Sequence, residues 1–216
     1  MRAPNCSGPA GFFAKRKERG SYHHGNLKET LLDVAEKLIA ERGPASITLS
    51  EMARMAGVSS AAIYRHYADL GALIGAVARR GFDDFGLRLR MAAQAGTATS
   101  GFSGMGDAYL AFARERPGAY AAMFSSTIGY TDPDLARAGE TAFNTLTEGL
   151  TGALAATGLS QQAAFALAIK VWALSHGVAT LAQSGRLTPA AGVVPEHILR
   201  DGVGALIQAA VENARA

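Results

Sequence analysis

Cysteine is almost absent from this chain, because its 216 residues include a single one, Cys6. One cysteine cannot form an intramolecular disulfide, and it cannot build a cysteine-based metal site. No apolar run reaches the roughly 18 residues of a membrane span, because Gly, Thr and charged residues interrupt the alanine-rich stretches. The start, M-R-A-P-N-C, lacks the apolar core of a secretory signal. We therefore expect a soluble cytoplasmic protein with no membrane partner.

A set of catalytic residues is also missing. We find no pairing of a nucleophile with a base, no glycine-rich phosphate loop and no cluster of metal ligands. Ser175 and His176 are adjacent in sequence, but on a helix their side chains point about 100° apart. The sequence therefore predicts a protein that is not an enzyme and that holds no metal and no cofactor.

The charge of the chain is unevenly distributed, although its net value is only +3. Residues 1–80 contain 12 Lys or Arg against 7 Asp or Glu, which gives +5. Residues 81–216 contain 9 against 11, which gives −2. This asymmetry indicates a part that faces nucleic acid, joined to a near-neutral part.

Residues 48–67, T-L-S-E-M-A-R-M-A-G-V-S-S-A-A-I-Y-R-H-Y, have the pattern of two short helices and a tight turn. Thr48 and Glu51 have the spacing of a capping box at the start of the first helix. Gly57 can adopt the positive φ that ends this helix, and Ser59 is expected to cap the next one. The pattern predicts a helix-turn-helix, whose second helix lies in the DNA major groove.

The second helix of this motif carries small residues first and then Y-R-H-Y at positions 64–67. Hydrogen-bonding and cationic side chains in one turn suit phosphate oxygens and base edges, with Arg65 the strongest candidate. Two helices of any helical bundle could share this spacing without binding DNA, but the polar turn favours a DNA interface. The residues of the motif expected at DNA are Thr48, Ser59, Ser60, Ala61, Ala62, Tyr64, Arg65 and His66.

A basic cluster precedes the motif at Lys15, Arg16 and Lys17, within residues 1–20 that also contain Pro, Gly and Ser. This composition predicts a disordered tail. It also suits an arm that reaches into a DNA minor groove. The two interpretations are compatible, because DNA can order such an arm.

The remaining pattern is helical throughout, with no sustained β-type alternation. Asn26 is expected to cap a supporting helix, Asp69 begins a long connecting helix, and residues 93–106 are expected to form a loose loop. Arg114 to Arg116 are expected to form a solvated helix end. We predict an all-α fold with a three-helix DNA-binding domain at residues 21–68 and a C-terminal helical domain at residues 69–216.

These residues resemble the TetR family of bacterial transcriptional regulators. The resemblance covers residues 27–77, including A-G-V-S-S-A-A-I-Y-R-H-Y, and continues in W-A-L-S-H-G, with Trp172, His176 and Gly177 at the positions of a Trp-His-Gly type C-terminal domain. It implies a homodimer that binds a palindromic operator, usually as a repressor that a small molecule releases. The C-terminal domain would bind this ligand and form the dimer.

The resemblance also implies roles for single residues in contact with DNA. Phosphate contacts fall to Thr48, Tyr64 and His66, and positions at base edges or the groove wall fall to Ser60, Ala61, Ala62 and Arg65. Leu70 departs from the family, which commonly has Lys at this position, so one phosphate contact is lost. The alternative function is therefore a dimeric protein that binds an apolar ligand and has weak or lost specific DNA binding.

The C-terminal half contains aromatic side chains at helical spacing. Such a set can be plain core, but the resemblance implies an apolar cavity. His176 lies one turn from Trp172, where it could brace the helices or anchor a ligand. The candidate ligand contacts are Phe112, Tyr120, Phe124, Phe143, Trp172 and His176.

The last two predicted helices also carry small and apolar residues at helical spacing. Two such helices from each subunit can form a four-helix dimer interface. The residues expected there are Ala166, Ala173, Gly177, Leu181, Ile198, Val203, Leu206, Ile207 and Ala210.

Overall fold

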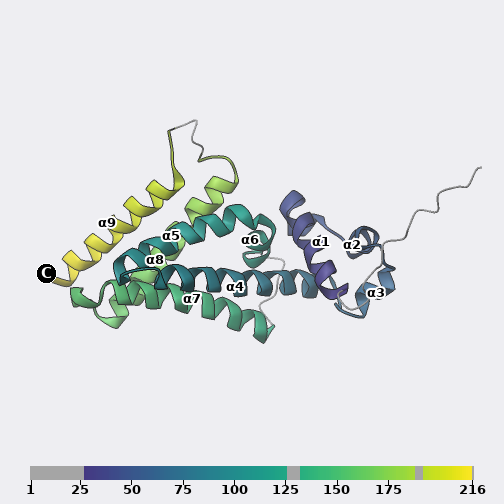
Figure 1. Ribbon diagram of the computed structural model, residues 1–216, viewed down its shortest axis with the longest axis horizontal. Coiled ribbons are helices and arrows are strands. Elements are labelled where there is room, and N and C mark those ends of the chain that lie inside the picture. Colours follow the sequence, from purple (N-terminus) through teal and green to yellow (C-terminus); the bar gives the residue numbers. More distant parts are fainter. Residues whose placement is uncertain (1–26, 126–131, 188–191, 216) are drawn as a thin grey trace, which may run out of the picture.

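The computed structural model describes residues 27–125, 132–187 and 192–215, and within these ranges the regular elements are all helices (Figure 1). The all-α fold class is therefore confirmed. The helices are α1 (Leu27–Arg42), α2 (Leu49–Ala56), α3 (Ser60–Tyr64), α4 (Leu70–Gln94), α5 (Ala98–Glu115), α6 (Pro117–Met123), α7 (Pro133–Ala153), α8 (Gln161–Gln183) and α9 (Pro195–Arg215), with 3-10 turns at Pro44–Ser46 and Ala155–Thr157.

Helices α1, α2 and α3 form a small unit at one end of an elongated molecule (Figure 1). Helix α4 begins at this unit and extends into a larger helical bundle, where it contacts α5, α6 and α7. Helices α8 and α9 pack against each other and against α5. The helix α4 thus joins the small unit to the larger bundle.

Local capping explains why the helix-turn-helix forms. The Thr48 hydroxyl accepts a hydrogen bond from the Glu51 N–H at 3.3 Å. Gly57 has φ 70° and ψ 27°, and Val58 N–H donates to the Ala53 carbonyl at 2.9 Å, which closes α2. The expected capping box is only half formed, because the Glu51 carboxylate pairs with Arg42 at 2.7 Å.

Ser59 was expected to cap the following helix through its side chain. It does occupy the position before α3, but its side chain makes no capping hydrogen bond. Asp69, in contrast, caps α4 by accepting a hydrogen bond from the Ala72 N–H at 2.7 Å. The expected cap at Asn26 lies outside the described residues.

The expectation of a loose loop at residues 93–106 is wrong, because α5 already begins at Ala98. Thr97 and Ser100 form a full capping box, in which each side chain bonds to the backbone N–H of the other. Burial of Met105 and Tyr109 along the same helix then outweighs the low helix propensity of the Gly, Ser and Thr residues.

The expectation that no apolar run has the length of a membrane span is wrong for helix α8. By length and composition alone, this helix could cross a membrane, since Lys170 is its only Lys, Arg, Asp or Glu residue. This is weak evidence, because the core helices of soluble proteins pass the same test. Here α8 packs against α5, α7 and α9.

Candidate nucleic-acid interface and ligand cavity

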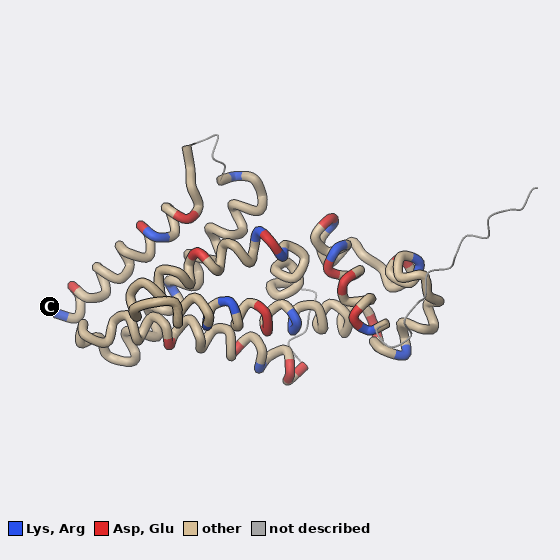
Figure 2. Tube along the Cα trace, viewed as in Figure 1, with Lys and Arg blue, Asp and Glu red and all other residues tan. Residues whose placement is uncertain are grey.

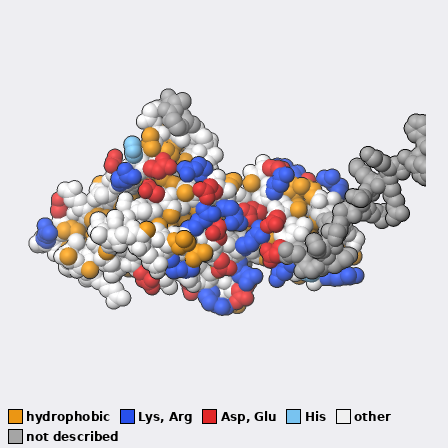
Figure 3. All heavy atoms as spheres, in the orientation of Figure 1, with side chains coloured by type: hydrophobic (Ala, Val, Ile, Leu, Met, Phe, Trp, Pro, Cys, Tyr) orange, Lys and Arg blue, Asp and Glu red, His pale blue; other side chains and the backbone are white. Residues whose placement is uncertain are grey.

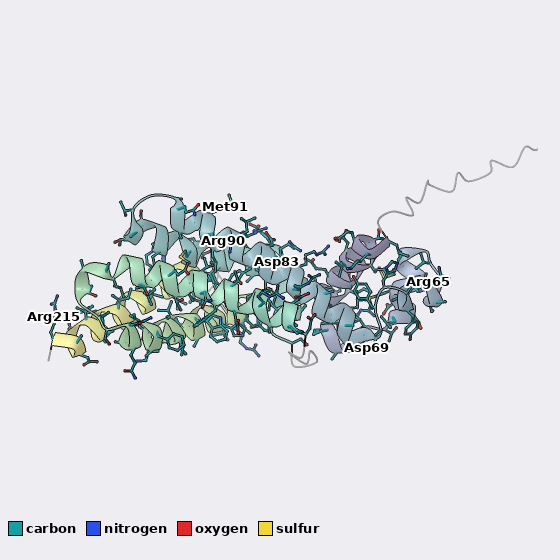
Figure 4. All side chains as sticks on the ribbon, turned by 90° about the horizontal axis from the view of Figure 1, so that it is seen from below. Arg65, Asp69, Asp83, Arg90, Met91 and Arg215 are labelled. Atoms are coloured by element: carbon teal, nitrogen blue, oxygen red, sulfur yellow. The ribbon has the colours of Figure 1, made fainter. Side chains whose placement is uncertain are left out.

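Helix α3 presents a polar face at the end of the molecule (Figure 4). Its anchor is Ile63, which is fully buried against the core of the small unit. Ser60, Tyr64 and Arg65 lie on the opposite side and are exposed, with Tyr64 58% accessible. This arrangement leaves the polar side chains free for a ligand as large as duplex DNA.

Most predicted DNA contacts share this exposed surface. Tyr67 does not, because it is buried beneath α3, where burial and the charge of Glu29 raise the pKa of its hydroxyl. Ala62 is only half-buried, and the basic cluster from Lys15 to Lys17 lies outside the described residues. The exposed set is Thr48, Ser59, Ser60, Ala61, Tyr64, Arg65 and His66.

A shallow hollow lies between the start of α2 and the end of α3. Its lining includes Thr48, Ser50, Tyr64 and Leu70. The backbone N–H groups at the start of α2 favour anions, whereas the carboxylate of Asp69, which also lines the hollow and caps α4, adds a negative charge. The side chain of Leu70 adds no positive charge there.

A cluster of ion pairs joins α1 to the larger bundle, which sequence reasoning missed. The Arg116 guanidinium donates to both carboxylate oxygens of Glu36, at 2.6 and 2.7 Å, and to Asp84 at 2.7 Å. Arg80 also pairs with Glu36, at 2.8 Å. These ion pairs form a belt between α1 and the larger bundle, in a part of the molecule where charged side chains gather (Figures 2 and 3). Arg116 is therefore not part of a solvated helix end.

The electrostatics of Glu36 follow from this belt. Burial by itself would raise the pKa of the Glu36 carboxyl, because burial disfavours the charged form. Hydrogen bonds from Arg116 and Arg80 outweigh this effect and lower the pKa. Glu36 therefore stays ionised at neutral pH and holds the two arginines in place.

Helix α6 lies directly against α1 at Gly118. A Cβ atom at this position would come within 2.0 Å of the Glu36 carbonyl oxygen, so no side chain fits. On its other side α6 packs against α4, where a Cβ at Gly81 would meet the Met123 sulfur at 2.9 Å. Helix α6 is thus wedged between the DNA-binding unit and the long connecting helix.

The larger bundle contains an apolar cavity of about 550 Å³ between α4, α7 and α8. Seven of its described lining residues are aromatic, and Glu140 at its rim is the one charged residue among them. The lining residues are Phe82, Phe85, Leu89, Tyr109, Phe124, Ala136, Gly139, Glu140, Ala142, Phe143, Leu146, Phe165, Ile169 and Trp172. A second, smaller cavity of about 190 Å³ lies between α5, α8 and α9.

Three of the six predicted ligand residues, Phe124, Phe143 and Trp172, line this cavity. Phe112 does not, because it is fully buried between the Phe85 ring and the Arg88 guanidinium.

Tyr120 and His176 also lie outside the lining. The Tyr120 hydroxyl bonds to His176 Nδ1 at 2.8 Å and to the Tyr109 hydroxyl at 3.4 Å. Burial raises the pKa of Tyr120 to about 12 and lowers that of His176. In the described structure His176 therefore braces α6 against α8.

Sequence reasoning missed several walls of the cavity, among them Phe82, Phe85 and Phe165. Phe82 and Phe85 are buried side chains of α4, and both also line the cavity. Their spacing on α4, three residues apart, was the available signal.

The surface of α8 and α9 carries exposed apolar side chains, including Phe165, Ile169 and Leu181. Of the residues expected at a dimer interface, Ala166, Ala173, Leu181 and Ile198 are exposed. Four others are partly buried against the core of their own chain, because one face of α9 packs on α5 and α8. These four are Val203, Leu206, Ile207 and Ala210.

Comparison with known proteins agrees with this architecture. Residues 31–77 match the family model described as bacterial regulatory proteins, tetR family. Residues 102–206 match the model described as tetracyclin repressor-like, C-terminal domain.

Individual proteins with a similar sequence or fold share less than 30% of their residues with this chain. An uncharacterized HTH-type transcriptional regulator of Mycobacterium tuberculosis, Rv0681, is 26% identical over 158 residues, covering 73% of this chain and 71% of the relative. A protein with unknown function from Rhodococcus sp. RHA1 is 28% identical, with a TM-score of 0.74 over 88% of this chain and 98% of its own. A tetR-family transcriptional regulator from Streptomyces coelicolor, 19% identical, shares the fold with a TM-score of 0.67 over 87% of this chain and 83% of its own. The chain therefore belongs to the TetR family of transcriptional regulators, which bind DNA and are not enzymes.

Proposed function

We propose that this regulator is a homodimeric repressor that binds a palindromic operator and is released when a small apolar ligand fills the cavity of about 550 Å³. The observation that carries this proposal is the position of Phe82 and Phe85. Both line the cavity, and both belong to α4, the helix whose first residue lies at the helix-turn-helix.

The proposed release follows from this geometry. A ligand that separates α4 from α7 changes the tilt of α4 and presses on α6 through Gly81 and Met123. Helix α6 in turn contacts α1 at Gly118. If the ligand binds the tilted state better and DNA binds the other state better, each weakens the binding of the other. The coupling free energy is about 1–3 kcal/mol in typical cases.

We assign the DNA contacts by the exposure of α3 and the hollow beside it. Arg65 reads base edges, while Thr48, Tyr64 and His66 contact phosphates. Ser59, Ser60, Ala61 and Ala62 lie against the groove wall or base edges. The basic residues Lys15, Arg16 and Lys17 form an arm that adds phosphate contacts, in a minor groove or along the backbone.

The dimer is assigned to the exposed apolar face of α8 and α9. Leu181 is 42% exposed and Ile198 is 36% exposed, although both are large and apolar. Burial of such a face against a second copy removes this area from water. Two-fold symmetry would then place the two α3 helices about 34–36 Å apart, as successive major grooves require.

The remaining assignments are organisational. Residues 1–20 form the basic arm, residues 21–68 the DNA-binding domain, and residues 69–216 the domain for ligand and dimer. The C-terminal domain is of the Trp-His-Gly type, with Trp172 in the cavity wall and His176 behind it. The protein acts in the cytoplasm.

Selection from a randomised pool of duplex DNA at near-physiological salt tests the proposal. We expect enrichment of one palindrome, with one dimer bound to each site. Weak binding that is independent of sequence and abolished by salt would instead indicate that Leu70, in place of the Lys common in the family, has cost the protein its specific DNA binding. The alternative function, a dimeric protein for apolar ligands with lost specific DNA binding, would then replace the repressor.

A further inference from the structure

We propose that the cavity selects a lipophilic organic cation, an aromatic or quaternary onium compound, over neutral or anionic ligands of the same size. This inference rests on the proposed function of the cavity as the effector site and names the chemistry of its ligand. The combination of aromatic walls and one carboxylate carries it.

The walls supply the first part of this selectivity. The aromatic lining residues are Phe82, Phe85, Tyr109, Phe124, Phe143, Phe165 and Trp172. The face of an aromatic ring carries the negative part of its quadrupole and attracts cations within about 6 Å of its centre. Ring faces that border a cavity therefore stabilise a bulky cation and not an anion.

Three of these rings form a continuous patch between α7 and α8. The ring of Phe143 lies 6.0 Å from that of Phe165 and 5.8 Å from that of Trp172, in edge-to-face geometry in both pairs. Phe165 is 54% exposed and Trp172 is 38% exposed. Unlike buried core rings, these rings can therefore be reached by a ligand.

Glu140 supplies the second part. It lies on α7 one turn before Phe143, at the rim of the cavity. Within the described part of the chain its carboxylate forms no hydrogen bond and no ion pair. An unpaired carboxylate beside aromatic walls is a counter-charge for a cation held in the cavity, and it repels an anion.

Three arginines of α4 and α7 line a neighbouring groove that shares Phe82 with the cavity. Arg79, Arg90 and Arg137 lie with Asp83 and Asp134 on the outer side of α4 and α7. These arginines do not line the cavity, and Arg137 is paired with Asp134. The five charged residues of the groove have a net charge of +1, but they line the groove and not the cavity, where Glu140 is the one charged residue of the described lining.

Two ions of nearly equal size and opposite charge test the proposal: tetraphenylphosphonium and tetraphenylborate. Trp172 is the only tryptophan of the chain and lies in the cavity wall, so its fluorescence reports occupancy in the full-length protein. We expect the cation to bind at least about tenfold more tightly than the anion at low salt. Equal affinities, or tighter binding of the anion, would overturn the inference.

Two variants separate the carboxylate from general surface charge. Glu140→Gln removes the rim charge, whereas Glu148→Gln removes an exposed charge on the same helix outside the cavity lining. We expect Glu140→Gln to weaken cation binding by about two- to fivefold and Glu148→Gln to leave it unchanged. If both variants bind the cation as tightly as the wild type, Glu140 is not the counter-charge for the cation, and this part of the inference is wrong.

A neutral probe, triphenylphosphine oxide, distinguishes this inference from the proposed function beneath it. If the neutral probe binds as tightly as the cation, the cavity is a ligand site but does not select cations. If none of the three probes changes the Trp172 signal, the effector site itself is refuted. In the supporting case, Phe143→Leu weakens the cation more than the neutral probe, because the ring is lost and the apolar volume is kept.

Discussion

The carboxylate of Glu36 in α1 accepts two hydrogen bonds from the guanidinium of Arg116, at 2.6 and 2.7 Å, although the two residues are 80 positions apart. Arg116 lies between α5 and α6, so this bidentate pair joins the DNA-binding unit to the bundle that surrounds the aromatic cavity. Bidentate pairs of this kind fix orientation as well as distance.

Removing the negative charge at the centre of this pair should destabilise the protein. Glu36→Gln leaves the partly buried Arg80 and Arg116 without their shared counter-charge, and we expect a loss of about 2 kcal/mol in the free energy of unfolding. Chemical denaturation measures this value. Glu41→Gln, on an exposed position of the same helix, is the control and should change stability by less than about 0.5 kcal/mol.

A methyl group at Gly118 should break the contact between α6 and α1. Gly118→Ala puts a Cβ 2.0 Å from the Glu36 carbonyl oxygen, so the helices must separate, and we expect a loss of at least about 1–3 kcal/mol. Gly152→Ala in α7 has no atom within 4 Å and should stabilise by about 0.5–1 kcal/mol. Thermal unfolding that moves both variants in the same direction would contradict the close packing of α6.

Two substitutions at the C-terminal end of α3 should separate base recognition from phosphate binding. Arg65→Ala should cost about 1–3 kcal/mol on the best operator and relax its sequence preference. Tyr64→Phe removes one hydroxyl and should weaken binding to all sequences by about 0.5–1.5 kcal/mol.

Binding of both variants to selected and random duplexes tests this assignment. Arg215→Ala, which removes the same charge at the opposite end of the molecule, is the control (Figure 4). If Arg65→Ala keeps both affinity and preference, Arg65 does not read a base.

The acid sensitivity of the bundle should depend on His176. Burial lowers the pKa of His176 below its ordinary value of 6.5, so on acidification the unfolded chain binds this proton before the folded one does. Stability should therefore fall as the pH drops from about 7 to about 5.

His176→Asn cannot titrate, but its side chain can still accept a hydrogen bond from Tyr120. Its free energy of unfolding should fall less over this pH range than that of the wild type, by denaturant titration at each pH. Glu36 titrates at lower pH because its pKa is lowered, so it does not account for the difference. Parallel pH profiles for variant and wild type would show that His176 is not the sensor.

The helix-turn-helix was predictable because its determinants are local. Thr48, Gly57 and Asp69 act on backbone groups within a few residues, so their spacing in the sequence already specifies the caps. Two local predictions failed because contacts with other parts of the chain outweighed the local pattern. The Glu51 carboxylate found a partner in Arg42 instead of the backbone, and burial drew the glycine- and serine-rich start of α5 into a helix.

The lining of the aromatic cavity was only half predictable. Aromatic residues at helical spacing identify an apolar face, but Phe112 and Phe143 carry the same signal in the sequence. Packing decides between them, because Phe112 is enclosed by Phe85 and Arg88, whereas Phe143 borders an open space between α7 and α8.

The sequence by itself determined the all-helical fold, the position of the helix-turn-helix and the basic character of that end of the chain. These properties follow from periodicity, capping and charge, which act over a few residues or over composition. Only the tertiary structure decided that Arg116 holds Glu36, that α6 touches α1 at Gly118, and that Glu140 stands at the rim of an aromatic cavity. Each of these depends on side chains distant in the chain meeting at a few ångströms, which no spacing within one segment records.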